Sequence, residues 1–236
     1  MSNNYHVIIP CAGSGSRFGL AVPKQYYQIL DKTVLEWTLN SFIELSDAIK
    51  SISVIYTAED NYILAYKLKY PTINFIAVGG QSRAESVLNG LHYLSNKIAQ
   101  PNDWVMVHDA ARCLIDKQDI LNLLDRVKET QFGGILAIAA NDTLKQVDKY
   151  NLTIEQTIDR NKIYLAQTPQ VFKHQELLDA LTQINLDAIT DESSAIEQFG
   201  KSSQVVLTQY PNFKITYPQD ILLAEFILQK RLERGI

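Results

Sequence analysis

Short apolar runs alternate with segments of helical periodicity along most of this chain of 236 residues. The apolar runs predict strands at 7–9, 52–56, 73–78, 104–107 and 135–140. The segments between them predict helices over 34–46 and 61–69, after Ser82 and after Asp116. Strands that alternate with helices favour a parallel sheet with helices on both faces. We therefore predict an α/β fold with one Rossmann-like domain over residues 1–236 and a mostly parallel, twisted sheet.

A small-residue loop with two cations follows the first predicted strand. Its sequence is Pro10-Cys11-Ala12-Gly13-Ser14-Gly15-Ser16-Arg17-Phe18-Gly19, with Pro23-Lys24 shortly after. Small residues let a backbone approach a ligand closely, and Arg17 and Lys24 suit phosphate groups. The dinucleotide fingerprint and the P-loop both fail here, because the sixth position from Gly13 is Phe18 and the one from Gly15 is Leu20. The loop favours an irregular wrap around polyphosphate, and an ordinary strand-to-helix turn stays open as the alternative.

Two more strand ends carry polar residues of the same kind. Gly79-Gly80-Gln81 follows the run 73–78, and Ser82 with Glu85 has the pattern of a capping box. The run 104–107 delivers His108-Asp109-Ala110-Ala111-Arg112. Ligands of open parallel sheets sit beyond the carboxyl ends of the strands, so these segments predict one site together with the first loop.

The region 141–161 interrupts the alternation and predicts a β-hairpin arm. Its two alternating segments, 143–148 and 152–158, are joined at Lys149-Tyr150-Asn151. A lone two-stranded ribbon is marginal in water, so the arm should pack on something. Further along, a helix is predicted near 175–183, a cap at 190–194 for a helix that ends before Gly200, strands at 203–208 and 213–216, and a closing helix after Pro218.

Composition excludes several kinds of protein. The net charge of −4 gives no overall basic field for nucleic acid, and the chain has no apolar run long enough to span a bilayer. The first residues lack the pattern of a signal peptide, and two distant cysteines favour reduced thiols, so we expect a cytoplasmic protein. The four histidines form no cluster with the spacing of a zinc site.

These motifs resemble the cytidylyltransferases that act on 2-C-methyl-D-erythritol 4-phosphate in non-mevalonate isoprenoid synthesis. The pattern Ala-Gly-x-Gly-x-Arg-Phe-Gly with Pro-Lys, Gly-Gly-x-x-Arg-x-x-Ser-Val, and His-Asp-Ala-Ala-Arg occur in the family's order from Pro10 to about Glu225. The resemblance implies transfer of CMP from CTP to a sugar-alcohol phosphate, with release of pyrophosphate. It also implies Mg²⁺, and a homodimer in which the arm reaches the neighbouring active site.

The resemblance also implies roles for individual residues. Catalysis would depend on Arg17, Lys24, Asp109 and Lys214, with Asp109 beside the metal. The nucleotide would contact Ala12, Gly13, Gly15, Gly80, Gln81, Arg83, Ser86 and Ala110. The acceptor would contact Asp109, Arg112, Thr143, Arg160, Thr168, Thr190 and Lys214. An acceptor phosphate has a second pKa of about 6 and is already ionised at neutral pH, so the reaction needs no general base.

Two positions depart from the family pattern. Cys113 stands where proline is expected, which bears on the stiffness of the loop, and Gln81 is neutral where some relatives carry an acid, which bears on ribose contacts. Each single residue also has a structural reading: Lys24 as a surface lysine, Asp109 as the polar end of a strand, Arg160 as half of a solvated pair, Thr190 as a helix cap and Lys214 as an edge charge.

Other functions stay open at this stage. A ribitol-5-phosphate cytidylyltransferase has the same loop, although Thr190-Asp191-Glu192-Ser193-Ser194-Ala195 favours the isoprenoid enzyme. A sugar-1-phosphate nucleotidyltransferase is usually longer and lacks the arm. A nucleotide-sensing protein that has lost catalysis is disfavoured by Arg17, Lys24, Asp109 and Arg112, and a dinucleotide oxidoreductase by the failed glycine count.

Overall fold

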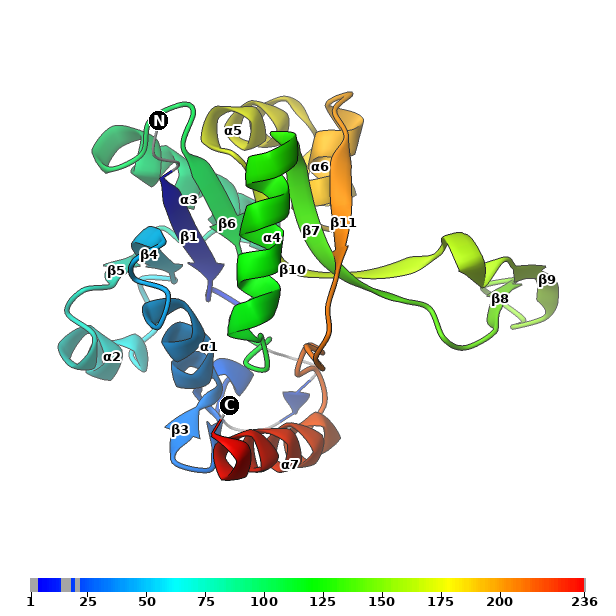
Figure 1. Ribbon diagram of the computed structural model, residues 1–236, viewed down its shortest axis with the longest axis horizontal. Coiled ribbons are helices and arrows are strands. Elements are labelled where there is room, and N and C mark those ends of the chain that lie inside the picture. The colour runs from blue at the N-terminus through cyan, green and yellow to red at the C-terminus, as the bar shows by residue number, and fades with distance from the viewer. Residues whose placement is uncertain (1–3, 14–17, 20–21, 236) are drawn as a thin grey trace.

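The computed structural model describes residues 4–13, 18–19 and 22–235 and has a seven-stranded sheet at its centre (Figure 1). In spatial order the strands are β11 (Ser203–Leu207), β7 (Gly133–Ala139), β10 (Tyr164–Lys173), β6 (Trp104–Val107), β1 (Tyr5–Pro10), β4 (Ile49–Ile55) and β5 (Asn74–Ile76). Every pairing is parallel except the two made by β10, which runs antiparallel to β6 and β7. The prediction of a mostly parallel α/β sheet is confirmed.

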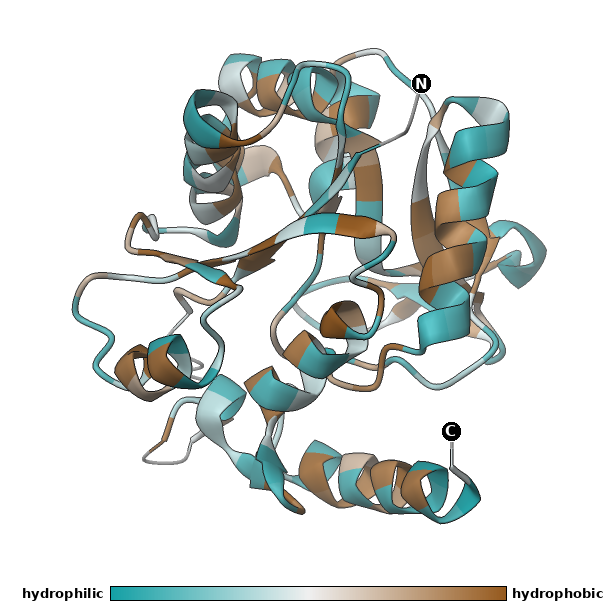
Figure 2. Ribbon diagram, turned by 60° about the vertical axis from the view of Figure 1, so that its left-hand side comes forward, coloured by the Kyte–Doolittle hydropathy of each residue, from teal (hydrophilic) through white to brown (hydrophobic). Residues whose placement is uncertain are grey.

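Helices cover both faces of the sheet. They are α1 (Val34–Ile43), α2 (Ile63–Lys69), α3 (Arg83–Lys97), α4 (Lys117–Thr130), α5 (His174–Gln183), α6 (Glu192–Gln198) and α7 (Gln219–Arg234). On β1, Val7 and Ile9 pack in one buried cluster with α1, α2 and α4, whereas Ile8 packs in a second cluster with α3, α5 and α6. This alternation along an apolar strand buries both sides of the sheet, and Figure 2 shows apolar residues along the central strands.

The last helix builds a third cluster beyond the carboxyl edge of the sheet. Ile221, Ala224 and Leu228 of α7 pack with Phe18 and Ile215. The short strands β2 (Gln28–Ile29) and β3 (Lys32–Thr33) lie in this region, together with the 3-10 turn η2 (Lys24–Tyr26). Ile215 follows Lys214 in the sequence and accepts a hydrogen bond from Lys24, so this cluster fixes the place where the two lysines come together.

The arm stands away from the rest of the molecule. Strands β8 (Leu144–Val147) and β9 (Ile154–Ile158) form a separate two-stranded sheet, followed by the 3-10 turn η3 (Arg160–Lys162). Figure 1 shows this hairpin at the end of a long extension of β7 and β10. The predicted β-hairpin is confirmed, and its apolar residues Val147, Leu152 and Ile154 are exposed on this chain.

Two local predictions are wrong. Residues 213–216 form no strand, because Ile215 uses its N–H for the Ala111 carbonyl and its own carbonyl for the Lys24 ammonium. At the start of α3, Ser82 caps the N–H of Glu85 as predicted, but Glu85 accepts from the N–H of Gln81, not from that of Ser82. The helix start therefore ties down the Gly80–Gln81 segment.

Two further observations concern the cysteines and the length of the apolar helices. Both cysteines are free and buried. In the described part of the chain, no helix combines the length and apolar character needed to cross a membrane.

A last 3-10 turn, η4 (Leu186–Ala188), leads from α5 toward α6.

Candidate active site

A cavity of about 250 Å³ lies where β1, β5 and β6 end at the same edge of the sheet. The predicted site residues that line it are Ala12, Gly13, Lys24, Gly80, Gln81, Arg83, Ser86, Asp109, Ala110 and Lys214. These residues come from four segments that are distant in the sequence. The predicted convergence of three strand ends on one site is therefore confirmed, and Gly15 and Arg17 lie outside the described residues.

The glycine segment after β5 is shaped by close backbone packing. A Cβ on Gly79 would lie 2.7 Å from the Ala12 Cβ and 2.8 Å from the backbone carbon of Tyr56, so only glycine fits between these two strand ends. The N–H of Gly80 donates to the Ser86 hydroxyl at 3.0 Å. Backbone and small hydroxyl groups thus form part of this wall of the cavity, and such groups allow close approach of a ligand.

The Asp109 carboxylate is the centre of a charge cluster. Its Oδ1 accepts from Arg83 Nε at 2.7 Å and its Oδ2 from Lys214 Nζ at 2.8 Å, while Arg112 Nε lies 3.6 Å from Oδ2. Burial alone would raise the pKa of this carboxyl, but Arg83 and Lys214 outweigh burial and hold the pKa well below its usual range. Asp109 is therefore a carboxylate at any physiological pH.

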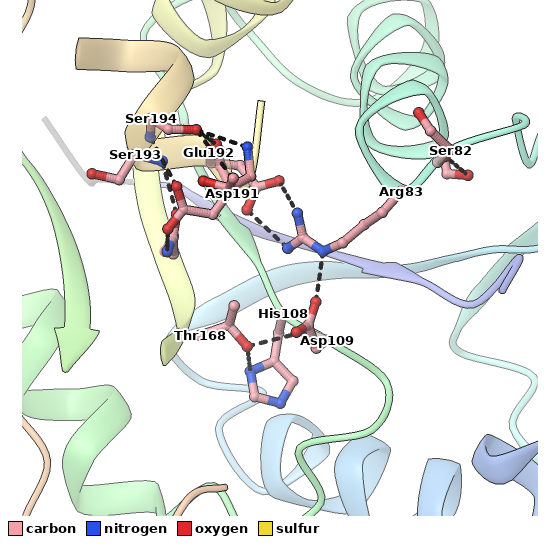
Figure 3. Close-up of polar contacts among 12 residues, drawn as sticks. Ser82, Arg83, His108, Asp109, Thr168, Asp191, Glu192, Ser193 and Ser194 are labelled. Carbon is pink, nitrogen blue, oxygen red and sulfur yellow. Dashed lines mark hydrogen bonds and ion pairs between the residues drawn. The ribbon is translucent and has the colours of Figure 1, made fainter. Parts of the chain in front are cut away.

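Buried neutral groups hold the Asp109 backbone in place. The N–H of Asp109 donates to the Thr168 hydroxyl at 3.1 Å, and that hydroxyl also lies 3.1 Å from His108 Nδ1 (Figure 3). His108 Nε2 donates to the Arg112 carbonyl at 3.1 Å, which leaves Nδ1 to accept from Thr168. Burial lowers the pKa of His108 to about 3, so its ring is neutral. Thr168 is only 4% exposed and contacts the turn of Asp109 instead of lining the cavity.

Two lysines meet on the other side of the cavity. Lys24 Nζ donates to the carbonyl of Ile215 at 2.8 Å, next to Lys214 in the sequence. Lys24 begins the turn η2, after Pro23 fixes an extended approach. Of the described charged residues that line the cavity, Lys24, Arg83 and Lys214 outnumber the one carboxylate, Asp109, so positive charge is in excess.

The remaining predicted acceptor residues do not line the cavity. Arg112 donates to the carbonyl oxygens of Asn212 and Ala166 behind Asp109. Thr190 is exposed, and its N–H donates to Ser194 at the start of α6. Thr143 and Arg160 are exposed on the arm, where the Arg160 guanidinium donates to the carbonyl of Asn141.

The sequence analysis missed the carboxylate that pairs with Arg83. Glu192, at the first position of α6, accepts from both terminal nitrogens of Arg83, at 2.6 and 2.9 Å. It lies 109 positions along the chain from Arg83 and is 1% exposed. In the sequence Glu192 stands within the segment 190–194, which was predicted to cap a helix. That role accounts for a glutamate at this position, so nothing in the sequence pointed to a contact with Arg83.

The donor set around Asp109 fits Mg²⁺ only together with substrate phosphates. Among the described residues, no three His, Cys, Asp or Glu side chains gather into a metal-binding group. Each Asp109 oxygen nevertheless keeps acceptor capacity beyond its one hydrogen bond. Mg²⁺ is commonly bound through one or two carboxylates, waters and substrate phosphates, and Asp109 can supply the protein ligand.

Comparison with known proteins agrees with this geometry. The family model for 2-C-methyl-D-erythritol 4-phosphate cytidylyltransferase (IspD) matches residues 5–230. The enzyme of that name from Neisseria meningitidis serogroup C is 40% identical over 222 residues, which cover 94% of this chain and 96% of the relative. A bifunctional IspD/IspF enzyme from Albidiferax ferrireducens is 42% identical over 224 residues, and the match spans 95% of this chain but only 53% of that relative.

Solved structures give the same result. A crystal structure of 4-diphosphocytidyl-2C-methyl-D-erythritol synthase superimposes with a TM-score of 0.83 and 34% identity, covering 97% of this chain and 100% of that one. The Francisella tularensis IspD structure has a TM-score of 0.78 and 37% identity, with 95% and 99% covered. With the family model covering nearly the whole chain, the protein belongs to the 2-C-methyl-D-erythritol 4-phosphate cytidylyltransferase family and is a nucleotidyltransferase.

Proposed function

We propose that this protein transfers CMP from CTP to 2-C-methyl-D-erythritol 4-phosphate in the synthesis of isoprenoid precursors. The products are 4-diphosphocytidyl-2-C-methyl-D-erythritol and pyrophosphate. The observation that carries the proposal is the cavity in which the Ala12–Gly13 loop, the Gly80–Ser86 segment, Asp109 and two lysines meet. Family membership supports this reaction over the other nucleotidyl transfers.

The chemistry follows from the charges at the site. A phosphate oxygen of the acceptor attacks the α-phosphorus of CTP, a new P–O bond forms, and the bond to the β-phosphate oxygen breaks. Both reactants are anions, so Lys24 and Lys214 would reduce their repulsion and stabilise the charge of the transition state. We include Arg17 in this role from its place in the loop motif.

The nucleotide half of the site would be formed by the glycine segments. The backbone of Ala12, Gly13, Gly80 and Gln81 and the Ser86 hydroxyl suit the edge of cytosine and its ribose, with Ala110 beside them. Gly15 belongs to the same loop motif. Asp109 would hold Mg²⁺, which supplies positive charge on the phosphates when it is bound.

The acceptor half would require a second subunit. Thr143 and Arg160 lie on the arm, which projects away from the central sheet and its helices (Figure 1), and neither residue lines the cavity of its own chain. The exposed Val147, Leu152 and Ile154 give the arm an apolar surface of the kind that packs against another protein. We therefore propose a homodimer in which each arm reaches the partner's acceptor site, next to Arg112, Thr168 and Thr190.

The reaction is tested by measuring pyrophosphate release with each of the four nucleoside triphosphates and with two acceptors. We expect turnover with CTP and 2-C-methyl-D-erythritol 4-phosphate. Turnover with ribitol 5-phosphate alone would contradict the proposed acceptor. Binding of NADH without detectable binding of CTP would contradict nucleotidyl transfer itself.

The assembly is tested by sedimentation velocity. We expect a dimer for the wild-type protein and a larger monomer fraction for Ile154→Lys, which places a charge on the apolar face of the arm. Gln146→Lys adds the same charge on the opposite face of the hairpin, because Gln146 alternates with Val147 along β8, and it serves as the control. A wild-type monomer at the concentration of the activity assay would contradict the dimer.

A further inference from the structure

The Arg83 guanidinium is held between two carboxylates from different parts of the chain. Its Nη1 and Nη2 donate to the two oxygens of Glu192, at 2.6 and 2.9 Å, and its Nε donates to Asp109 Oδ1 at 2.7 Å (Figure 3). Every nitrogen of the guanidinium thus has a carboxylate partner. The rigid fork of arginine fixes the angle at which Nε meets Asp109, which a lysine could not do.

Glu192 is itself held firmly. The N–H of the next residue, Ser193, donates to the Gln170 side-chain oxygen at 2.8 Å, and the Gln170 amide donates to Asp191 at 2.8 Å. Gln170 belongs to β10 and is 1% exposed. The first turn of α6 is therefore fastened to the sheet, and the Glu192 carboxylate has little freedom to follow a moving arginine.

These contacts decide how Arg83 can act. A swing of Arg83 toward a bound triphosphate would leave the Glu192 carboxylate, 1% exposed, without the cation that pairs with it in this cluster. Leaving a buried charge unpaired is strongly unfavourable. Arg83 therefore remains between the carboxylates, where it occupies one oxygen of Asp109 and leaves the other to Lys214.

We propose that Glu192 is a positioning residue, which through Arg83 fixes the Asp109 carboxylate for nucleotidyl transfer. The inference rests on the proposed function, because Asp109 is the group whose orientation matters there. It also gives Arg83 a role different from direct nucleotide binding. The pair joins the helix α3, which follows the nucleotide segment, to the helix α6, which follows Thr190 on the acceptor side.

The contact itself is tested without any substrate. The Nε–H signal of Arg83, assigned by its loss in Arg83→Lys, is followed by nitrogen-15 NMR for exchange with water. We expect exchange at least about tenfold faster in Glu192→Gln, because neutral glutamine cannot hold the fork through two charged bonds. Glu197→Gln, the same change on an exposed residue of α6, is the control and should leave exchange unchanged. Equal exchange in Glu192→Gln and wild type would overturn the proposal.

The role in catalysis is tested by separating turnover from nucleotide binding. We expect Glu192→Gln to lower kcat at least about tenfold and to change the Kd for CTP, measured by calorimetry, less than about threefold. Arg83→Lys should behave in the same way, and the double variant should be no worse than the worse single variant, since both changes break one unit. Glu197→Gln should keep kcat within about twofold of wild type.

Three results would count against the positioning role. Additive losses in the double variant would show that the two residues act separately. A tenfold weaker Kd for CTP in Arg83→Lys but not in Glu192→Gln would make Arg83 a nucleotide ligand. Full kcat in folded Glu192→Gln would remove Glu192 from the reaction.

Two controls keep the outcome clear. If Glu192→Gln does not fold, Glu192→Asp keeps the charge on a side chain one methylene shorter, and we expect the same loss of kcat at unchanged Kd. A wild-type protein without turnover would contradict the proposed function, and the NMR exchange would still decide whether Glu192 fixes Arg83.

Discussion

The cavity and the arm differ in the kind of residue that they bury and the kind that they expose. In the cavity, charged residues such as Asp109 and Glu192 are buried and each has a partner from another element. On the arm, apolar residues such as Leu152 and Ile154 are exposed, and strands β8 and β9 pair only with each other. The described lining of the cavity comes from several segments of one chain, whereas the arm exposes apolar side chains away from the rest of the described chain.

This difference explains which residues can be interpreted from one chain alone. The contacts of Lys24, Asp109 and Lys214 lie within one chain and bring two lysines to one cavity, as the proposed function requires. Arg160 and Thr143 do not line the described cavity, so their proposed role depends on where the arm goes. Substitutions in the two regions should accordingly differ in size and in kind.

The largest effect is expected for Lys24→Ala. Loss of one preorganised cation from a charge-stabilising site lowers turnover by roughly 10²–10³-fold. The measurement is kcat for pyrophosphate release, with circular dichroism to confirm the fold. Lys50→Ala, a change of an exposed lysine in β4, is the control. A rate close to that of wild type would remove Lys24 from the site.

Arg160→Ala tests whether the arm serves a neighbouring subunit. Loss of a charge-assisted contact to the acceptor phosphate should lower kcat/KM for the acceptor by about 10–100-fold and leave the Kd for CTP unchanged. The position of Arg160 on the arm predicts that the loss appears in the partner's site.

Mixed dimers decide between the two subunits. A Lys24→Ala chain paired with an Arg160→Ala chain contains one intact site if the arm acts across the dimer, so an equal mixture should recover about a quarter of wild-type activity by random pairing. No recovery would show that each arm serves its own chain.

Local pattern predicted most of this molecule because most of its elements are determined locally. The apolar alternation of β1 and the apolar stripe of α3 specify which sides are buried, and the strand ends could be grouped because parallel strands share an edge. The segments of Gly80 and Asp109 were grouped in this way, by their position after a strand, whereas Ser86 was found only through the family motif.

The missed features depend on contacts between distant segments. Nothing near Glu192 in the sequence points to Arg83, since a glutamate in the first turn of a helix is explained by the helix itself. The apolar pattern at 213–216 suggested a strand, but the segment is shaped by its contacts to Ala111 and Lys24. Tertiary partners decided these positions, and a single sequence does not show them.

Removing a capping aspartate should have a smaller effect, which we compare at the start of α6 and at the tip of the arm. Asp191→Ala removes the cap of α6 and one partner of the Gln170 amide, so we expect the free energy of unfolding to fall by about 2 kcal/mol. Asp148→Ala removes the analogous contacts to the backbone of Tyr150 and Asn151 at the tip of the arm.

Urea denaturation separates the two variants. Because the arm forms a separate sheet that stands away from the rest of the described chain, Asp148→Ala should change the free energy of global unfolding by less than about 0.5 kcal/mol. An equal loss in both variants would mean that the arm unfolds together with the core.

The smallest effect is expected at two residues with a left-handed backbone conformation, one in the body of the molecule and one on the arm. Leu152 on the arm has φ 57° and Gln131 after α4 has φ 58°. Asparagine tolerates this conformation better than either leucine or glutamine, so each substitution to Asn should remove up to about 1 kcal/mol of strain.

Gln131→Asn should then raise the free energy of global unfolding, since α4 packs on the sheet. Leu152→Asn should instead slow hydrogen exchange only in β8 and β9, by no more than about fivefold. If Leu152→Asn weakens a dimer observed by sedimentation, the leucine contacts the partner, and the loss of that apolar contact outweighs the relief of strain at the tip of the arm.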